Sequence, residues 1–209
     1  MPSTKSLARE ATLGDNGDAP RAGRPRSEAA RRAILRSTLR LLRRTGFNDL
    51  SIEAIAEDAN VGKSTVYRWW PSKGALVVDA FSSSVRRQLS FPDTGSVYSD
   101  VSLQMSHVVR LFRSRRGQIV AALIGGGQTD PELIEAFRER FVRPRRMEAY
   151  ETLRKGIERG ELSRDADLDL ILDSLYGAIY MRFLIWNDGL SESFVEAVCR
   201  LVLDGARHR

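Results

Sequence analysis

Residues 63–69 gather side chains that can donate hydrogen bonds to an acceptor-rich surface. Around one aliphatic residue, Val66, the segment carries Lys63, Ser64, Thr65, Tyr67, Arg68 and Trp69. Ammonium, guanidinium and hydroxyl groups suit the acceptors of guanine, the base edges and the phosphates of the DNA major groove. A helix on an ordinary protein surface needs no such set, so the segment indicates contact with DNA.

The sequence contains few residues that are suited to catalysis or to metal binding. The chain has two histidines, His107 and His208, and one cysteine, Cys199. These residues form no visible set of nucleophile, base and orienting group, and they offer few ligands for zinc. The glycines at 125–127 are not a phosphate loop, because no strand precedes them and no Gly-Lys-Ser or Gly-Lys-Thr follows. We expect no enzyme activity, no cofactor and no metal.

Basic charge concentrates toward the beginning of the chain. The 209 residues include 33 Lys and Arg against 27 Asp and Glu, a formal net charge of +6. Residues 1–75 hold 14 basic and 8 acidic side chains, whereas residues 76–209 hold 19 of each. This asymmetry is typical of a polyanion-binding head joined to an electrically neutral body. On charge alone, a basic surface that keeps the protein soluble explains the excess equally well.

The composition favours a cytoplasmic protein. The first residues contain no apolar segment of a signal peptide, and no stretch approaches the ~20 apolar residues of a membrane helix. One cysteine allows no internal disulfide, so an oxidising compartment is unnecessary. We expect Cys199 to be a small buried side chain rather than a redox sensor.

Hydrophobic periodicity and capping residues predict an all-α chain. We expect helices over residues 27–45, 51–59, 63–70, 72–89, 97–112, 117–124, 130–160, 166–187 and 191–205. Pro144 should kink the long helix that follows Asp130 or divide it in two. The three glycines at 125–127 are expected to form a flexible connection.

The helices over 51–59 and 63–70 are joined by a three-residue turn, which predicts a helix-turn-helix. Asn60 tolerates the left-handed backbone that such a turn needs. Ala56, Val61 and Val66 are spaced to close the small core between the two helices. This motif would hold the donors of residues 63–69 at the protein surface.

The first 26 residues mix Ser, Thr, Gly, Asp and Pro with almost no large apolar side chains. We therefore expect residues 1–26 to be a disordered basic arm. Such an arm can lie along a minor groove of DNA, and we expect Arg24 and Arg26 to make this contact. For Arg21 a solvated tail is at least as good an explanation.

The helix-turn-helix and its flanks resemble those of the TetR family of bacterial transcriptional regulators. The resemblance covers about residues 27–81 and includes the sequence IEAIAEDANVGKSTVYRWWPSKGALVVDAF at 52–81. Its markers are Gly46-Phe47, the IAEDANV turn, Thr65-Val66-Tyr67 and Trp70-Pro71-Ser72-Lys73. The resemblance implies a DNA-binding domain over residues 27–75 and a larger helical body, residues 76–209, that binds a ligand and dimerises through its last two helices.

The resemblance also implies particular DNA contacts. Base-facing positions of the family correspond to Lys63, Ser64, Thr65 and Arg68. Phosphate-binding positions correspond to Tyr67, Trp69 and Lys73, and a cap position that often touches the DNA backbone corresponds to Ser51. Two departures bear on these contacts. Gly62 stands where the family commonly has Ser or Thr, and Trp69 replaces a common His or Tyr, so its contact is either an indole N–H or plain packing.

Residues 166–187 and 191–205 carry wide apolar stripes that suit the four-helix bundle by which the family dimerises. Packing inside a monomer is the alternative. We favour a homodimer, because a two-fold operator needs two heads about 34–36 Å apart. The body is also expected to hold a mostly apolar pocket with a few polar groups. Its candidate lining residues, each of which plain core packing also explains, are His107, Met147, Tyr176, Tyr180 and Trp186.

These observations predict a sequence-specific regulator, namely a homodimeric repressor that a small-molecule inducer releases from a palindromic operator. Its partners would be double-stranded DNA, a second copy of the chain and an unknown small molecule, with no membrane involved. The alternative is a helical ligand-binding or interaction protein whose DNA binding is non-specific or vestigial.

Overall fold

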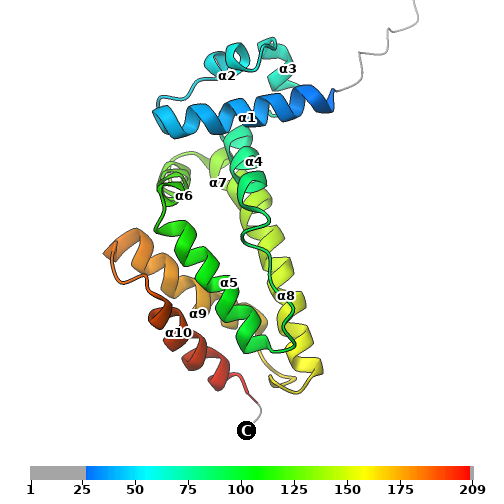
Figure 1. Ribbon diagram of the computed structural model, residues 1–209, viewed down its shortest axis with the longest axis vertical. Coiled ribbons are helices and arrows are strands. Elements are labelled where there is room, and N and C mark those ends of the chain that lie inside the picture. Colours follow the sequence, from blue (N-terminus) through cyan, green and yellow to red (C-terminus); the bar gives the residue numbers. More distant parts are fainter. Residues whose placement is uncertain (1–26, 208–209) are drawn as a thin grey trace, which may run out of the picture.

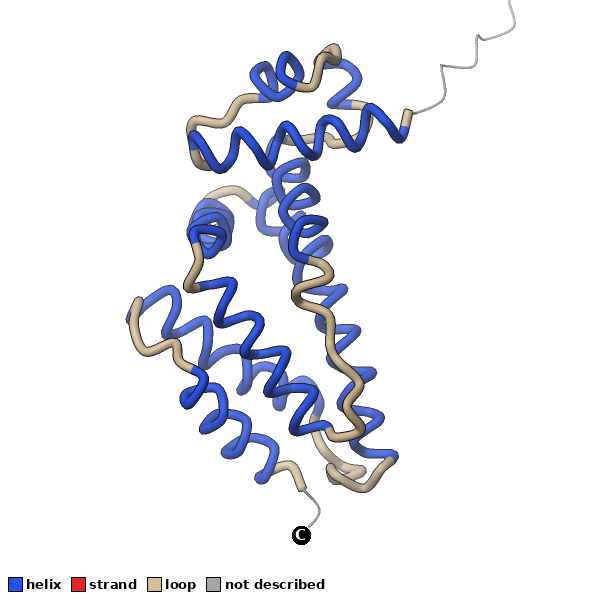
Figure 2. Tube along the Cα trace, viewed as in Figure 1, coloured by secondary structure: helices blue, strands red, loops and turns tan. Residues whose placement is uncertain are grey.

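The computed structural model describes residues 27–207, and this range is helical with no strand (Figures 1 and 2). The elements are α1 (Glu28–Thr45), α2 (Ile52–Asp58), α3 (Lys63–Tyr67), α4 (Lys73–Val85), α5 (Val97–Phe112), α6 (Arg115–Gly127), α7 (Pro131–Phe137), the π-helical turn η1 (Arg138–Val142), α8 (Arg143–Glu158), α9 (Leu168–Met181), the π-helical turn η2 (Arg182–Trp186) and α10 (Glu192–Gly205). The all-α prediction is confirmed. Arg24 and Arg26 of the expected arm lie outside the described residues.

Helices α1, α2 and α3 form a head at one end of the molecule (Figure 1). Helix α4 packs against α1 and then continues along α7 and η1. On the other side of the body α5 packs against α6, α8 and α10, and α9 packs against α8 and α10. Helix α4 is therefore the element that the head and the body share.

Serine caps define the starts of the head helices. Ser27, Ser51 and Ser72 each accept a hydrogen bond from the amide three residues later, at 3.3, 3.1 and 3.1 Å. These bonds satisfy N–H groups that the first helical turn leaves without partners. Helix α3 begins without a side-chain cap, because Gly62 occupies the capping position.

The helix-turn-helix closes as the sequence predicts. Asn60 adopts φ 52° in the turn between α2 and α3, and the Val61 amide donates to the Ala56 carbonyl at 2.9 Å. Ala56 and Val66 are buried, and Val61 packs against them from a half-buried position. Helix α3 is shorter than expected, since residues 68 and 69 form a turn and Trp70 is not helical.

The expectation of a flexible connection at residues 125–127 is wrong, because these three glycines form the last turn of α6. Helix α7 packs directly on Gly126 and Gly127. A Cβ atom on Gly127 would lie 2.9 Å from the Cβ of Ile134, and one on Gly126 would lie 3.1 Å from Leu133 Cδ2. The absence of side chains at these positions lets α6 and α7 approach closely.

Pro144 divides the long helix expected over residues 130–160. Proline has no N–H to donate to the carbonyl four residues earlier, and its ring crowds that carbonyl. The π-helical turn η1 accommodates this proline, and in it the Arg143 amide donates a hydrogen bond to the Arg138 carbonyl. The helix expected over 166–187 likewise ends in a π-helical turn, η2, after which Asn187 is left-handed at φ 51°.

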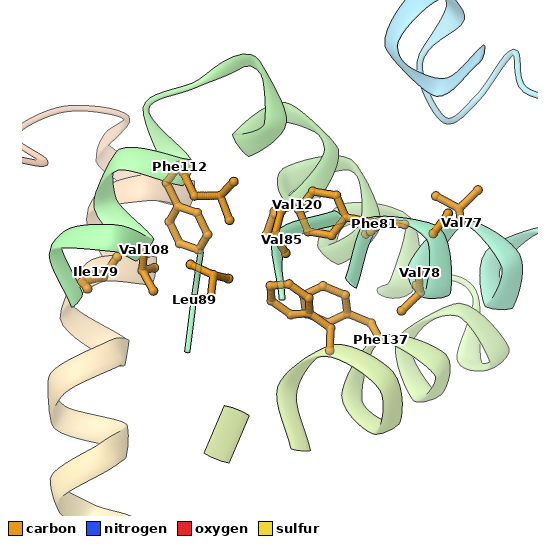
Figure 3. Packing of buried hydrophobic residues seen from close by; sticks show 14 of the residues in the cluster. Val77, Val78, Phe81, Val85, Leu89, Val108, Phe112, Val120, Phe137 and Ile179 are labelled. Atoms are coloured by element: carbon orange, nitrogen blue, oxygen red, sulfur yellow. The ribbon is translucent and has the colours of Figure 1, made fainter. Parts of the chain in front are cut away.

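The apolar core runs from the head through α4 into the body (Figure 3). Phe81 and Val85 of α4 lie near Val120 of α6, and the Phe81 ring centroid is 5.5 Å from that of Phe141 in η1. Farther along, Leu89 converges with Val108 and Phe112 of α5. Within residues 27–207 no helix combines the length and apolarity that crossing a membrane requires.

Candidate functional site

Helix α3 turns most of the nominated DNA-contacting residues outward. Lys63, Ser64, Tyr67 and Arg68 are exposed, Tyr67 to 51%, and Thr65 is half-buried. Val66, between them, has no exposed surface and anchors the helix in the head core. The structure thus brings the predicted donors together on one surface of the head.

An ion pair fixes the start of α3 against α2. Lys63 Nζ lies 2.5 Å from Glu53 Oε1, and both side chains are more than half exposed. The hydrogen bond from Lys63 lowers the pKa of Glu53 below its ordinary value. Glu53 could not be identified from the sequence, because it lies ten positions before Lys63 and meets it only through the geometry of the turn. The pair orients the Lys63 ammonium along the α3 surface.

Asp79 of α4 connects three elements beneath the head surface that carries the predicted DNA contacts. Its Oδ2 atom accepts hydrogen bonds from the indole N–H of Trp70 at 2.9 Å and from Arg31 of α1 at 3.0 Å. Arg140 of η1 lies 4.0 Å from the same oxygen. Trp70 is only 1% exposed, so its indole lies in the core. The signal for Asp79 was present in the sequence, as a lone charge within the apolar run of α4.

Trp69, a predicted phosphate contact, packs against this connection. Its side chain is half-buried, and the Arg31 guanidinium lies 5.7 Å from the centroid of its ring. Its ring centroid is 6.1 Å from that of Trp70. The indole therefore supports the segment that ends α3, and its contact with a phosphate stays a prediction.

Lys73 and Ser51 serve the head itself. The Lys73 ammonium donates to the carbonyls of Phe47 at 3.1 Å and Asn48 at 3.4 Å, and it lies 4.7 Å from the centroid of the Phe47 ring. It ties the start of α4 to the turn between α1 and α2. The Ser51 hydroxyl caps α2. Phosphate contact by either residue stays a prediction.

The body contains a cavity of about 390 Å³ between α5, η1, α8 and α9, which the chain just after α4 also lines. This volume lies within the range of ≈300–1,000 Å³ that is typical of small-molecule sites. Its apolar lining includes Leu89, Val108, Phe112, Phe141, Val142, Ala149 and Leu172. Its polar lining consists of Gln104, Arg145, Arg146, Asp173, Tyr176 and Tyr180.

Only two of the five candidate ligand-binding residues share this cavity. Tyr176 and Tyr180 line it. His107 is half-buried on α5 outside the lining, with its pKa lowered by burial and then by Arg110. Met147 and Trp186 lie on the surface, 48% and 71% exposed. The sequence predicted helices over 97–112 and 130–160 but not which of their faces meets the cavity, so Gln104 and Arg145 were missed.

A chain of hydrogen bonds crosses the cavity wall to the end of α4. The Tyr176 hydroxyl donates to Gln104 Oε1 at 2.5 Å, and Gln104 Nε2 donates to the Leu89 carbonyl at 3.1 Å. Burial raises the pKa of Tyr176 well above its usual range, so the phenol stays a neutral donor. The wall formed by α9 is thereby connected through α5 to the segment that follows α4.

Two adjacent arginines of α8 line the cavity in different electrostatic states. Arg146 pairs with Asp169 and, at 2.8 Å, with Asp173. Arg145 forms no ion pair within the described part of the chain. Its Nη1 donates to the Phe141 carbonyl at 2.5 Å and its guanidinium carbon lies 4.0 Å from the centroid of the Phe141 ring, whereas its buried Nε has no hydrogen-bond partner among residues 27–207.

Cys199 of α10 is buried, as expected, and its thiol donates to the sulfur of Met105 at 3.4 Å. Burial raises the pKa of Cys199 to about 12. A thiol in this state is protonated at neutral pH and reacts slowly.

The last two helices leave an uncovered apolar face. The stripe expected to dimerise includes Ile171, Leu175 and Ile179, which are buried within the protomer. Other large apolar side chains of α9, η2 and α10 are exposed instead, namely Leu170, Met181, Leu184, Ile185, Trp186 and Leu201. Exposed apolar side chains that gather into a patch usually mark an interaction site.

Comparisons with known proteins agree in both parts of the chain. Residues 34–80 match the family described as bacterial regulatory proteins, tetR family, and residues 91–202 match the tetracyclin repressor-like C-terminal domain. The uncharacterized HTH-type transcriptional regulator YdeS of Bacillus subtilis is 41% identical over 173 residues, which are 83% of this chain and 87% of that protein.

More distant relatives and a solved structure agree with this match. The DNA-binding transcriptional repressor TetR of Mycobacteroides abscessus is 26% identical over 190 residues, 87% of this chain and 98% of that protein. The structure of the TetR family transcription regulator SCO0332 superposes with a TM-score of 0.78 at 37% identity, covering 87% of this chain and 100% of that chain. The chain therefore belongs to the TetR family of DNA-binding transcriptional regulators.

Proposed function

We propose that this protein is a homodimeric repressor that binds a palindromic operator through α3 of two heads and leaves it when a small molecule enters the body cavity. It acts by binding rather than by catalysis. The observation that carries the proposal is the position of α4. Asp79 holds α4 to the head through Trp70 and Arg31, and the segment after α4 lines the cavity at Leu89.

In this proposal the base-reading side chains are Lys63, Ser64 and the half-buried Thr65 of α3, together with Arg68 directly after it. Tyr67, Trp69, Lys73 and Ser51 contact phosphates around it, and Arg24 and Arg26 follow the minor groove. An arginine that pairs with guanine contributes about 1–3 kcal/mol of discrimination against the wrong base. Phosphate contacts add affinity without sequence preference.

The exposed apolar face of α9, η2 and α10 supports dimerisation. Leu201 is 79% exposed on α10, and Ile185 is also largely exposed on η2. Joining this face to its copy would remove the patch from water and hold two heads at the spacing of adjacent DNA turns, about 34–36 Å. Leu201→Glu should therefore yield a monomer in sedimentation experiments and weaken operator binding.

Ligand release follows from linkage. A molecule that moves Gln104, either directly or by displacing Tyr176 from it, would free the Leu89 carbonyl and let the segment after α4 shift. Since α4 is bonded to the head at Asp79, the shift would change the head spacing. A 10- to 100-fold loss of DNA affinity requires about 1.4–2.8 kcal/mol of coupling between the two sites.

Selection of the full chain on random duplex DNA, at about 0.15 M salt with competitor, tests the proposal. We expect an enriched palindrome with half-sites one turn apart. Arg68→Ala should relax the preference at one base position, whereas the exposed Arg87→Ala, outside the head, should leave it unchanged. DNA binding without an enriched sequence would contradict the proposal and favour a head with non-specific or vestigial DNA binding.

A further inference from the structure

We infer that the cavity takes an organic anion, a largely apolar molecule whose acidic group pairs with the Arg145 guanidinium. The inference rests on the proposed function, because it names the chemical class of the molecule that would enter the same cavity. The observation that carries it is the Arg145 guanidinium, which lies at the cavity wall and forms no ion pair among residues 27–207.

The charges around the cavity leave Arg145 uncompensated. Arg146 is matched by two carboxylates, those of Asp169 and Asp173. Arg145 interacts favourably with Glu148 but without a contact that counts as an ion pair, and Arg86 opposes this influence. Among the described residues the cavity lining therefore offers one cation that forms no ion pair.

The surroundings of Arg145 make an anion the favoured occupant. Burial lowers the pKa of Arg145 to about 10, so the side chain remains protonated at neutral pH although it has lost much of its hydration. Its Nε atom is also buried, and it has no hydrogen-bond acceptor among residues 27–207. A carboxylate would supply both charge and acceptor atoms in the planar geometry that guanidinium groups bind best.

Neighbouring cavity groups can complete the acid site. Tyr180 lies close enough to Arg145 for the two to interact electrostatically, and burial raises the pKa of Tyr180 to about 12, so its phenol is a neutral donor at pH 7. The apolar body of the ligand would lie against Phe112 and Leu172. A neutral ligand would leave the Arg145 charge unmatched, and a cationic ligand would be repelled by it.

Two matched probe series test the inference on the full chain. One consists of decanoate, decanamide and decylamine, and the other of 2-naphthoate, 2-naphthamide and 2-naphthylmethylamine. Calorimetry should show binding of at least one carboxylate and weaker binding of its amide and amine. Arg145→Met should weaken carboxylate binding at least about 30-fold, the loss expected when one partner of a buried charge pair is removed. Arg145→Lys should restore part of it.

The control variant is Arg143→Met, which removes an exposed arginine of the same helix that pairs with Glu139 outside the cavity. It should leave every affinity unchanged. The ligand-free Arg145→Met protein should melt no lower than the wild type, because its substitution removes an unmatched buried charge. A lower melting temperature together with equal losses for carboxylate and amide would assign Arg145 a structural role and overturn the inference.

The remaining outcomes separate this inference from the proposed function. Tighter binding of an amide or amine than of its carboxylate, or no binding of any probe, would overturn the anion inference while leaving operator recognition intact. Carboxylate binding that depends on Arg145 but does not release the selected operator DNA would uphold the inference and contradict ligand-controlled repression.

Discussion

Replacing Asp79 by alanine should lower the free energy of unfolding by about 2–4 kcal/mol. Its carboxylate accepts the indole N–H of the buried Trp70 at 2.9 Å, and hydrogen bonds to charged groups contribute about 1.5–3 kcal/mol. The partly exposed pair with Arg31 at 3.0 Å adds roughly 0.2–1 kcal/mol. Alanine would also leave the Trp70 N–H buried without this acceptor.

Urea denaturation of the full chain measures this loss, and Asp58→Ala is the matched control. Asp58 pairs with Arg40 at the surface of the same head. An exposed pair of this kind contributes at most about 1 kcal/mol. A double-mutant cycle of Asp79→Ala with Trp70→Phe isolates the indole bond, and it should give a coupling of at least about 1 kcal/mol.

DNA affinity provides the second readout. Because Asp79 joins α4 to both α1 and the end of the recognition segment, its loss should weaken operator binding more than Asp58→Ala does. If the two alanine variants unfold at the same urea concentration, or if Asp79 and Trp70 substitutions are additive, Asp79 does not connect head and body and the proposed route from cavity to DNA fails.

Two further outcomes concern stability. Burial raises the pKa of Glu161, but hydrogen bonds from Arg159 and the Val97 amide outweigh it and hold the pKa below 4.5. The ionised Glu161 therefore stabilises the fold at pH values above its ordinary pKa, and this stabilisation is lost as the pH falls through the lowered pKa of the folded protein. Glu161→Gln should flatten the decline of the urea midpoint between about pH 6 and about pH 3. Gly156→Ala would put a Cβ 2.9 Å from the Cβ of Val97 and should cost about 1–3 kcal/mol, whereas Gly125→Ala, with nothing within 4 Å, should cost none in the same urea titration.

Features that depend on neighbouring residues along the chain could be predicted from the sequence. Ser27, Ser51 and Ser72 cap helices because a hydroxyl can reach an amide three residues away in any context. Asn60 fits its turn for a similarly local reason. The donors of α3 could also be identified, since their exposure follows from burying the one apolar residue between them.

Features that depend on the packing of one helix against another could not be predicted from the sequence. Gln104 and Arg145 face the cavity only because α5 and α8 pack in one particular rotation, and His107, on the same helix as Gln104, faces elsewhere. The glycines of α6 looked flexible because their local preference opposes helix, but close packing of α7 selects helix there. Partners distant in the chain are invisible to periodicity.

The shared helix α4 limits how this protein can be recombined with its relatives. In a chimeric regulator, a junction at residue 75 or 76 would fall within the first turn of α4 and would separate Gly74 from the rest of that helix. A Cβ on Gly74 would lie 2.9 Å from Leu133 Cδ1 in the body, and Asp79, beyond the junction, accepts hydrogen bonds from Trp70 and Arg31 of the head, so both sets of contacts would cross the junction. A junction placed between residues 90 and 96 would carry α4 with its head, but the new body must then accept that helix. The head and the body of this chain are therefore not separately interchangeable modules.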